Sequence, residues 1–149
     1  MTGTEHRILG VNYFNAAWEL IDLPSRTPAQ DLDMVTLACA SRQHWHEAGG
    51  TDENLAVADW QVAHAASLAG WSGIALSFAR ACVDRVSASD VPTWMKASAH
   101  EGLARAHAAA GDRASYEAEA ARCRELLAQV DGDEDRTLIQ NQLDSIPAP

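Results

Sequence analysis

Four side chains of this sequence are spaced so that they could form one binding site. Trp60 and His64 are four positions apart, and Glu101 and Arg105 show the same spacing. Residues four apart lie on one face of an α-helix, so each pair would present its side chains together. Arginine binds carboxylates and phosphates through paired N–H donors, and tryptophan offers an aromatic surface for stacking. If the two helices are neighbours, these residues predict a groove for a peptide or a small anionic ligand.

A weak internal repeat indicates that the two helices are neighbours. The segment 63–70 (AHAASLAG) aligns with the segment 104–111 (ARAHAAAG) at an offset of 41 residues, which also places Cys82 over Cys123. Repeats of this length are typical of stacked helical hairpins. In this register the groove positions are Val57, Trp60, His64, Ser67 and Leu68 in one unit and Ser98, Glu101, Arg105, Ala108 and Ala109 in the next.

Apolar spacing and turn residues predict seven helices and no strands. Thr27 and Thr51 are expected to cap helices, and Gly49, Gly70 and Gly111 to end them. The expected helices cover about 5–21, 28–48, 51–70, 72–85, 92–110 and 112–130, with a short last one ending before Pro147. The predicted fold class is all-α: a right-handed stack of about three antiparallel helical hairpins plus a C-terminal capping helix, in a single domain over 1–149.

Helical periodicity also predicts which apolar side chains face inward. The expected inward positions include Ile8, Val11, Phe14 and Trp18 on the first helix, Leu32, Val35 and Trp45 on the second, and Leu138, Ile139, Leu143 and Ile146 on the last.

The composition argues against two classes of partner. The 149 residues carry a formal net charge of −10, with no clustered basic face. Nucleic acids and anionic membrane surfaces are therefore not expected as partners. Cys39, Cys82 and Cys123 are odd in number, lie in apolar helical patterns and lack a CxxC spacing, which predicts buried reduced thiols. With no visible signal peptide, the expected location is cytoplasmic.

Other polar residues offer weaker candidates. Arg42 and His44 on the second helix and Asn15 on the first are expected near the groove edge, or else in a hydrogen-bonded scaffold network. His44 and His46 point roughly 200° apart on a helix, so they do not share one ion unless other helices contribute, for example His64 and Glu101. Neither a metal nor a cofactor is predicted.

The segments 60–85 and 101–127 resemble units of the tetratricopeptide family. Each has an Ala-rich first helix, a turn glycine and small residues on the second helix, although the 41-residue offset exceeds the 34 of that family. The chain also resembles a group of small uncharacterised bacterial helical-repeat proteins, in the segments 12–15 (NYFN), 41–45 (SRQHW), 54–61 and 101–105 (EGLAR). The resemblance implies a TPR-like α-solenoid of bacterial origin and assigns no activity.

Three functions remain open at this point. The leading one is a non-catalytic binding or adaptor module whose concave groove holds a peptide or a small anionic ligand. The second is an enzyme in which His64 is a general base oriented by Glu101, with Arg105 holding an anionic substrate. The third is a structural homodimer. A plain alternative for the four residues is a surface Glu101–Arg105 pair beside a buried Trp60.

Overall fold

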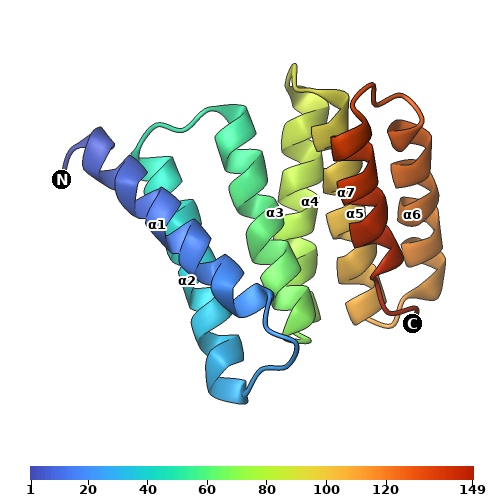
Figure 1. Cartoon of the computed structure of the whole chain (residues 1–149), viewed down its shortest axis with the longest axis horizontal. Helices are drawn as coiled ribbons and strands as arrows, with labels where there is room; N and C mark the ends of the chain where they lie inside the picture. Colours follow the sequence, from blue (N-terminus) through green and yellow to red (C-terminus); the bar gives the residue numbers. More distant parts are fainter.

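The computed structural model describes residues 1–149 and is entirely helical (Figure 1). The predicted all-α class is confirmed, and the seven observed helices end within one turn of the expected positions. They are α1 (Gly3–Ile21), α2 (Pro28–Glu47), α3 (Asp52–Leu68), α4 (Ser72–Ala88), α5 (Thr93–Ala109), α6 (Arg113–Leu127) and α7 (Asp133–Asp144).

Local sequence signals set the helix ends. Thr27 and Thr51 accept hydrogen bonds from the backbone N–H groups three residues on, forming capping boxes that begin α2 and α3. Gly49, Gly70 and Gly111 follow the last turns with positive φ angles of 67°, 79° and 75°. A side chain would strain this left-handed conformation, so glycine ends α2, α3 and α5 as predicted.

Successive helices run in opposite directions (Figure 1). The most extensive packing joins α1 with α2, α3 with α4, and α5 with α6. In addition α3 packs against α5, and α7 lies on α5 and α6. The middle of α3, residues 58–66, is buried on every side, so α3 is the central element of the molecule.

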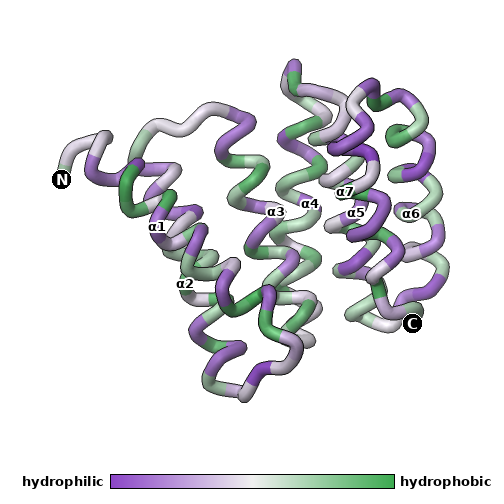
Figure 2. Tube along the Cα trace, in the orientation of Figure 1, coloured by the Kyte–Doolittle hydropathy of each residue, from purple (hydrophilic) through white to green (hydrophobic).

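Hydrophobic and hydrophilic residues are interspersed along the helices, as expected of helices with one buried side (Figure 2). None of the seven helices combines the length and the hydrophobicity that crossing a lipid bilayer requires.

Several residues expected inside are exposed. Ile8, Val11 and Leu32 expose 55%, 41% and 56% of their surface, and Leu138 exposes 58%. The predictions for these four were wrong because Ile8, Val11 and Leu32 lie on faces of α1 and α2 that no other helix covers, whereas α7 packs inward through Ile139 and Leu143. Cys82 and Cys123 are buried free thiols, but Cys39 is only half-buried, which corrects the expectation for that residue.

A buried charge cluster joins α2, α3 and α4. The Asp59 carboxylate is fully buried and accepts hydrogen bonds from Nε of Arg42 and from Nε of Arg85, the latter at 3.2 Å. The Arg42 guanidinium also lies over the Phe78 ring, 5.0 Å from its centroid. Because a buried carboxylate is unfavourable unless it is paired, Asp59 requires both arginines in place.

We expect Asp59→Asn to destabilise the fold by about 2–4 kcal/mol, because Arg42 loses its counter-ion at a partly desolvated site and Arg85 keeps only the exposed Asp52, 3.7 Å away. Urea unfolding followed by circular dichroism measures this change. The control is Asp84→Asn on the exposed side of α4, which should unfold like the parent chain. Equal stability of the two variants would contradict a structural role for the cluster.

Candidate functional site

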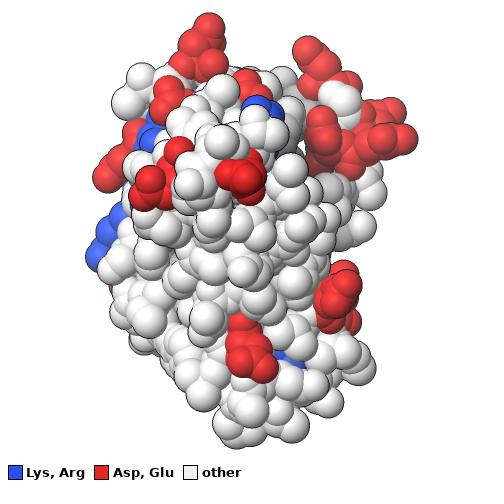
Figure 3. All heavy atoms as spheres, turned by 90° about the vertical axis from the view of Figure 1, so that its left-hand side faces the viewer, with Lys and Arg blue, Asp and Glu red and all other residues white.

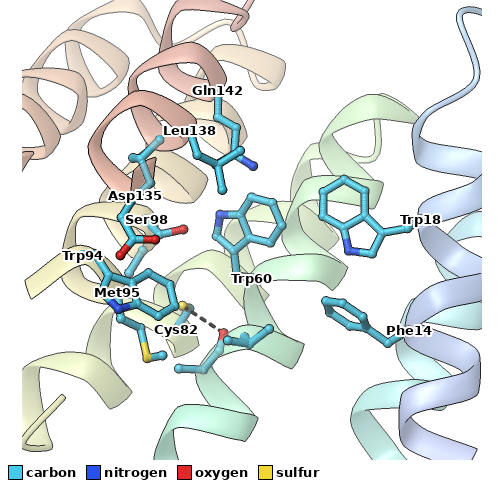
Figure 4. A pocket seen from close by; sticks show the side chains of 14 residues that line it. Phe14, Trp18, Trp60, Cys82, Trp94, Met95, Ser98, Asp135, Leu138 and Gln142 are labelled. Carbon is cyan, nitrogen blue, oxygen red and sulfur yellow. Dashed lines mark hydrogen bonds between the residues drawn. The ribbon is translucent and has the colours of Figure 1, made fainter. Parts of the chain in front are cut away.

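The best-defined cavity lies among α1, α3, α5 and α7 and has a volume of about 260 Å³ (Figure 4). Eleven of its fourteen lining residues are hydrophobic. It is lined by Phe14, Trp18, Ala56, Val57, Trp60, Cys82, Trp94, Met95, Ser98, Ala99, Asp135, Leu138, Ile139 and Gln142. Mostly apolar walls with a few polar groups are characteristic of ligand sites.

Aromatic rings form much of the wall. Trp60 stacks on Trp18 with ring centroids 5.9 Å apart and on His64 at 4.7 Å. The Phe14 ring meets Trp18 edge-on at 6.4 Å, and Trp94 faces the cavity from α5 on the other side (Figure 4). The indole of Trp60 therefore connects the α1 side of the cavity with the α5 side.

A buried hydrogen-bond network orients Trp60. Its Nε1 donates to Oε2 of Glu101 at 3.0 Å, and Nη2 of Arg105 lies 2.9 Å from Oε1 of the same carboxylate. The same Nη2 donates to the Gln142 carbonyl oxygen at 2.8 Å and to Oγ of Ser145 at 2.9 Å, at the end of α7. A cation is favourable there because the free carbonyls at a helix C-terminus carry partial negative charge. Burial raises the pKa of Glu101, and the Arg105 charge opposes this shift.

The structure thus brings the four predicted groove residues together, but not all of them reach the cavity. Trp60 lines it, as do Val57 and Ser98 from the predicted groove positions. Glu101 and Arg105 are buried and hydrogen-bonded to protein groups beside it. The alternative of a surface Glu101–Arg105 pair is therefore wrong, because α7 covers both side chains.

His64 is buried against the Trp60 ring, and its Nδ1 has no hydrogen-bond partner. Burial lowers the pKa of His64 to about 3, and the positive charges of Arg105 and Arg26 act in the same direction. The Glu101 oxygens accept hydrogen bonds from Trp60 and Arg105, and no hydrogen bond joins Glu101 to His64. His64 is consequently neutral at neutral pH.

The remaining candidates lie elsewhere. Arg42 is held by Asp59, and Asn15 is exposed on α1. The His44 side chain extends from α2 toward α1. Its Nδ1 is 2.8 Å from Nδ1 of His6, and its ring stacks on Tyr13. None of the three lines the cavity. No group of three or more His, Cys, Asp or Glu side chains is placed to hold a metal ion.

Sequence reasoning did not identify most of the cavity wall. Helical periodicity places Phe14 and Trp18 in the core stripe of the first helix and Leu138 in the seal of the last. It gives no sign that Trp94 or Asp135 lines a site. The available signal was the abundance of tryptophan, since three of the five tryptophans line this cavity.

A second cavity, of about 140 Å³, adjoins the first between α1 and α3. It is lined by Val11, Phe14, Trp45, Asn54, Val57 and Ala58, and it shares Phe14 and Val57 with the first cavity. Because they share these two side chains, the two cavities lie side by side along α1 and α3, and we refer to them together as the groove.

No family model, curated protein or solved structure matches this chain. Its function is therefore inferred from the groove and the side chains around it.

We expect Gly102→Ala to destabilise the fold by about 1–3 kcal/mol, because overpacking strains a filled core. A Cβ at Gly102 would lie 2.9 Å from Cδ1 of Trp60 and would push the indole away from Glu101. Chemical unfolding and the tryptophan emission spectrum report the two effects. Gly73→Ala in α4 is the matched control, since nothing lies within 4 Å of its added Cβ, and it should stabilise by about 0.4–1 kcal/mol. Stabilisation in both variants would contradict close packing at Trp60.

We expect His64 to make stability depend on pH. Its pKa is lowered to about 3 in the folded chain, so the unfolded chain binds the proton more tightly. The stabilisation is therefore present above the unfolded pKa of about 6.5 and is lost as pH falls towards 3. Near pH 5, His64→Gln should reduce the dependence of unfolding free energy on pH by about 1.4 kcal/mol per pH unit. Urea unfolding at a series of pH values from 7 to 4.5 measures this slope. His46→Gln, at an exposed histidine, should keep the parent slope, and an unchanged slope in His64→Gln would contradict the buried neutral state.

Proposed function

We propose that this chain is a non-catalytic binding module with a TPR-like architecture. The packing of α1 with α2, α3 with α4, and α5 with α6 supports a stack of three helical hairpins, with α7 as the cap. In such a stack the first helix of each hairpin lines the concave face. The observation that carries the proposal is that α1, α3 and α5, the three first helices, share the aromatic cavity and its extension.

The groove favours a peptide segment over a small anionic ligand. Its walls are apolar. Apolar side chains of a peptide that are buried against them would gain about 25 cal/mol of free energy per Å² of apolar surface removed from water. No basic side chain lines either cavity. Arg105, the residue expected to hold an anion, is 5% exposed and already bonded to Glu101 and α7. The two joined cavities suit successive apolar side chains of an extended segment.

The chemistry of the site favours binding over catalysis. A histidine with a pKa of about 3 is a weak base, so His64 is poorly suited to general-base catalysis at neutral pH. Burial raises the pKa of Cys82 and of Cys123 to about 12, which keeps both thiols protonated and unreactive. Three free thiols also suit the cytoplasmic location that we propose.

A homodimer is the second candidate function. Apolar surface is exposed at the start of the chain, by Met1 just before α1 and by Ile8 and Val11 on α1. A second copy docked there would cover the α1 side of the groove. It would then compete with a peptide, since Val11 also lines the second cavity.

Selection of short peptides from a display library on the immobilised protein tests the proposal, with affinities measured from tryptophan fluorescence. Leu138→Ser should weaken the selected peptides about tenfold, because truncating an apolar contact of this size costs about 1–2 kcal/mol. Leu138 lines the cavity, whereas Ile74, exposed on α4, provides the matched control Ile74→Ser, which should bind normally. Failure to select any peptide, or equal affinity for both variants, would contradict a binding role for the groove.

A further inference from the structure

The three polar side chains of the cavity have no partner within the protein. The Ser98 hydroxyl, the Asp135 carboxylate and the Gln142 amide line it, and none of them forms a hydrogen bond or an ion pair. In contrast, the polar side chains buried behind the wall, Glu101 and Arg105, are bonded to each other. Figure 4 shows the three free groups on the α5 and α7 side, across the cavity from Phe14 and Trp18. The cavity is therefore amphiphilic, with aromatic rings on both sides and the unused polar groups on its α5 and α7 side.

The charge at the polar side is negative. Asp135 is the one charged residue in the lining, and like Glu134 it is exposed to solvent. Arg136, the next residue in the sequence, is paired with Asp133 at 2.8 Å and forms no ion pair with Asp135. Asp135 belongs to the first turn of α7 together with Asp133 and Glu134. This turn lies at the upper end of the molecule, where acidic side chains gather (Figures 1 and 3). A cation is attracted to this end of the cavity and an anion is repelled.

The aromatic walls also suit a cation with an apolar stem. A cationic group over the face of tryptophan is attracted by the electron density of the ring, more strongly than over other aromatic rings. Trp60 and Trp94 line the cavity close to the free polar groups (Figure 4). A methylene stem would bury its surface against Leu138 and the indole rings, as lysine and arginine stems do on protein surfaces.

We propose that this cavity binds a lysine or arginine side chain of a partner peptide. The stem packs between Trp60 and Leu138, and the charged head donates hydrogen bonds to the Asp135 carboxylate and to the oxygens of Ser98 and Gln142. The inference rests on the proposed peptide-binding function and specifies its ligand. The peptide source is favoured over a free amine because the second cavity, along α1 and α3, provides room for the neighbouring residues.

Three capped pentapeptides test the cation directly. They have the sequence Ala-Ala-X-Ala-Ala, with X lysine, norleucine or glutamate, and norleucine keeps the stem without the ammonium group. Fluorescence titration at low ionic strength should show the lysine peptide binding at least fivefold more tightly than the norleucine peptide, and the glutamate peptide not binding. Added salt should weaken the lysine peptide alone.

Asp135→Asn should weaken the lysine peptide about tenfold and leave the norleucine peptide unchanged. The matched control is Glu134→Gln, which removes the same charge from the neighbouring exposed position and should leave the lysine peptide nearly unchanged. Circular dichroism confirms that both variants fold. Equal binding of lysine and norleucine peptides, or equal effects of the two substitutions, would overturn the cation assignment. Either result would leave the apolar groove, tested separately through Leu138→Ser, intact.

Hexylammonium distinguishes a peptide from a free amine. Val11 lines only the second of the two cavities, so Val11→Ser should weaken the lysine peptide at least threefold and leave hexylammonium unaffected. If hexylammonium binds as tightly as the lysine peptide and Val11→Ser alters neither, the peptide part of the proposal is overturned.

Discussion

The fully buried carboxylate of Glu101 is the constraint on which the rest of this structure depends. A carboxylate removed from water is strongly unfavourable unless its oxygens accept hydrogen bonds and its charge is balanced. Here the indole of Trp60 and the guanidinium of Arg105 meet both requirements. Arg105 in turn donates hydrogen bonds to the Gln142 carbonyl in the last turn of α7 and to the hydroxyl of Ser145, the residue that follows this helix. One carboxylate on α5 thereby fixes a ring on α3 and the position of the terminal helix.

This constraint also sets the character of the cavity. The charges of Glu101 and Arg105 compensate each other behind Trp60, so neither is presented to a ligand. The Trp60 ring, by contrast, forms part of the cavity wall. Gly102 packs closely against this ring, and a methyl group added at Gly102 would collide with it. The α7 helix then contributes Leu138 and Asp135. The result is an apolar wall with a single negative charge, in which a peptide side chain with a cationic end is a better match than an anion.

The opposite wall depends on a second set of buried polar contacts. Ser41 of α2 donates to the Gly10 carbonyl, and Gln61 of α3 donates to the Phe14 carbonyl at 2.9 Å. These two bonds hold α1 against its neighbours while leaving Ile8 and Val11 exposed. The groove between α1 and α3 persists because α1 packs mainly on α2 and meets α3 at only a few points, such as the Trp18 ring on Trp60.

The sequence by itself determined the seven helices and their ends. Caps such as Thr27 and Thr51 and turn glycines such as Gly70 act within a few residues, so their effects are legible without the fold. The 41-residue offset, which places Trp60 over Glu101, was legible for another reason: equivalent positions of repeated hairpins lie side by side in the stack. Only the tertiary structure decided that α7 covers Arg105, exposes Leu138 and brings Asp135 into the same cavity as Trp94. Those outcomes depend on which face α7 presents to α5. Helical periodicity identifies apolar positions, but it does not distinguish a side chain that packs against a neighbouring helix from one that lines an open cavity.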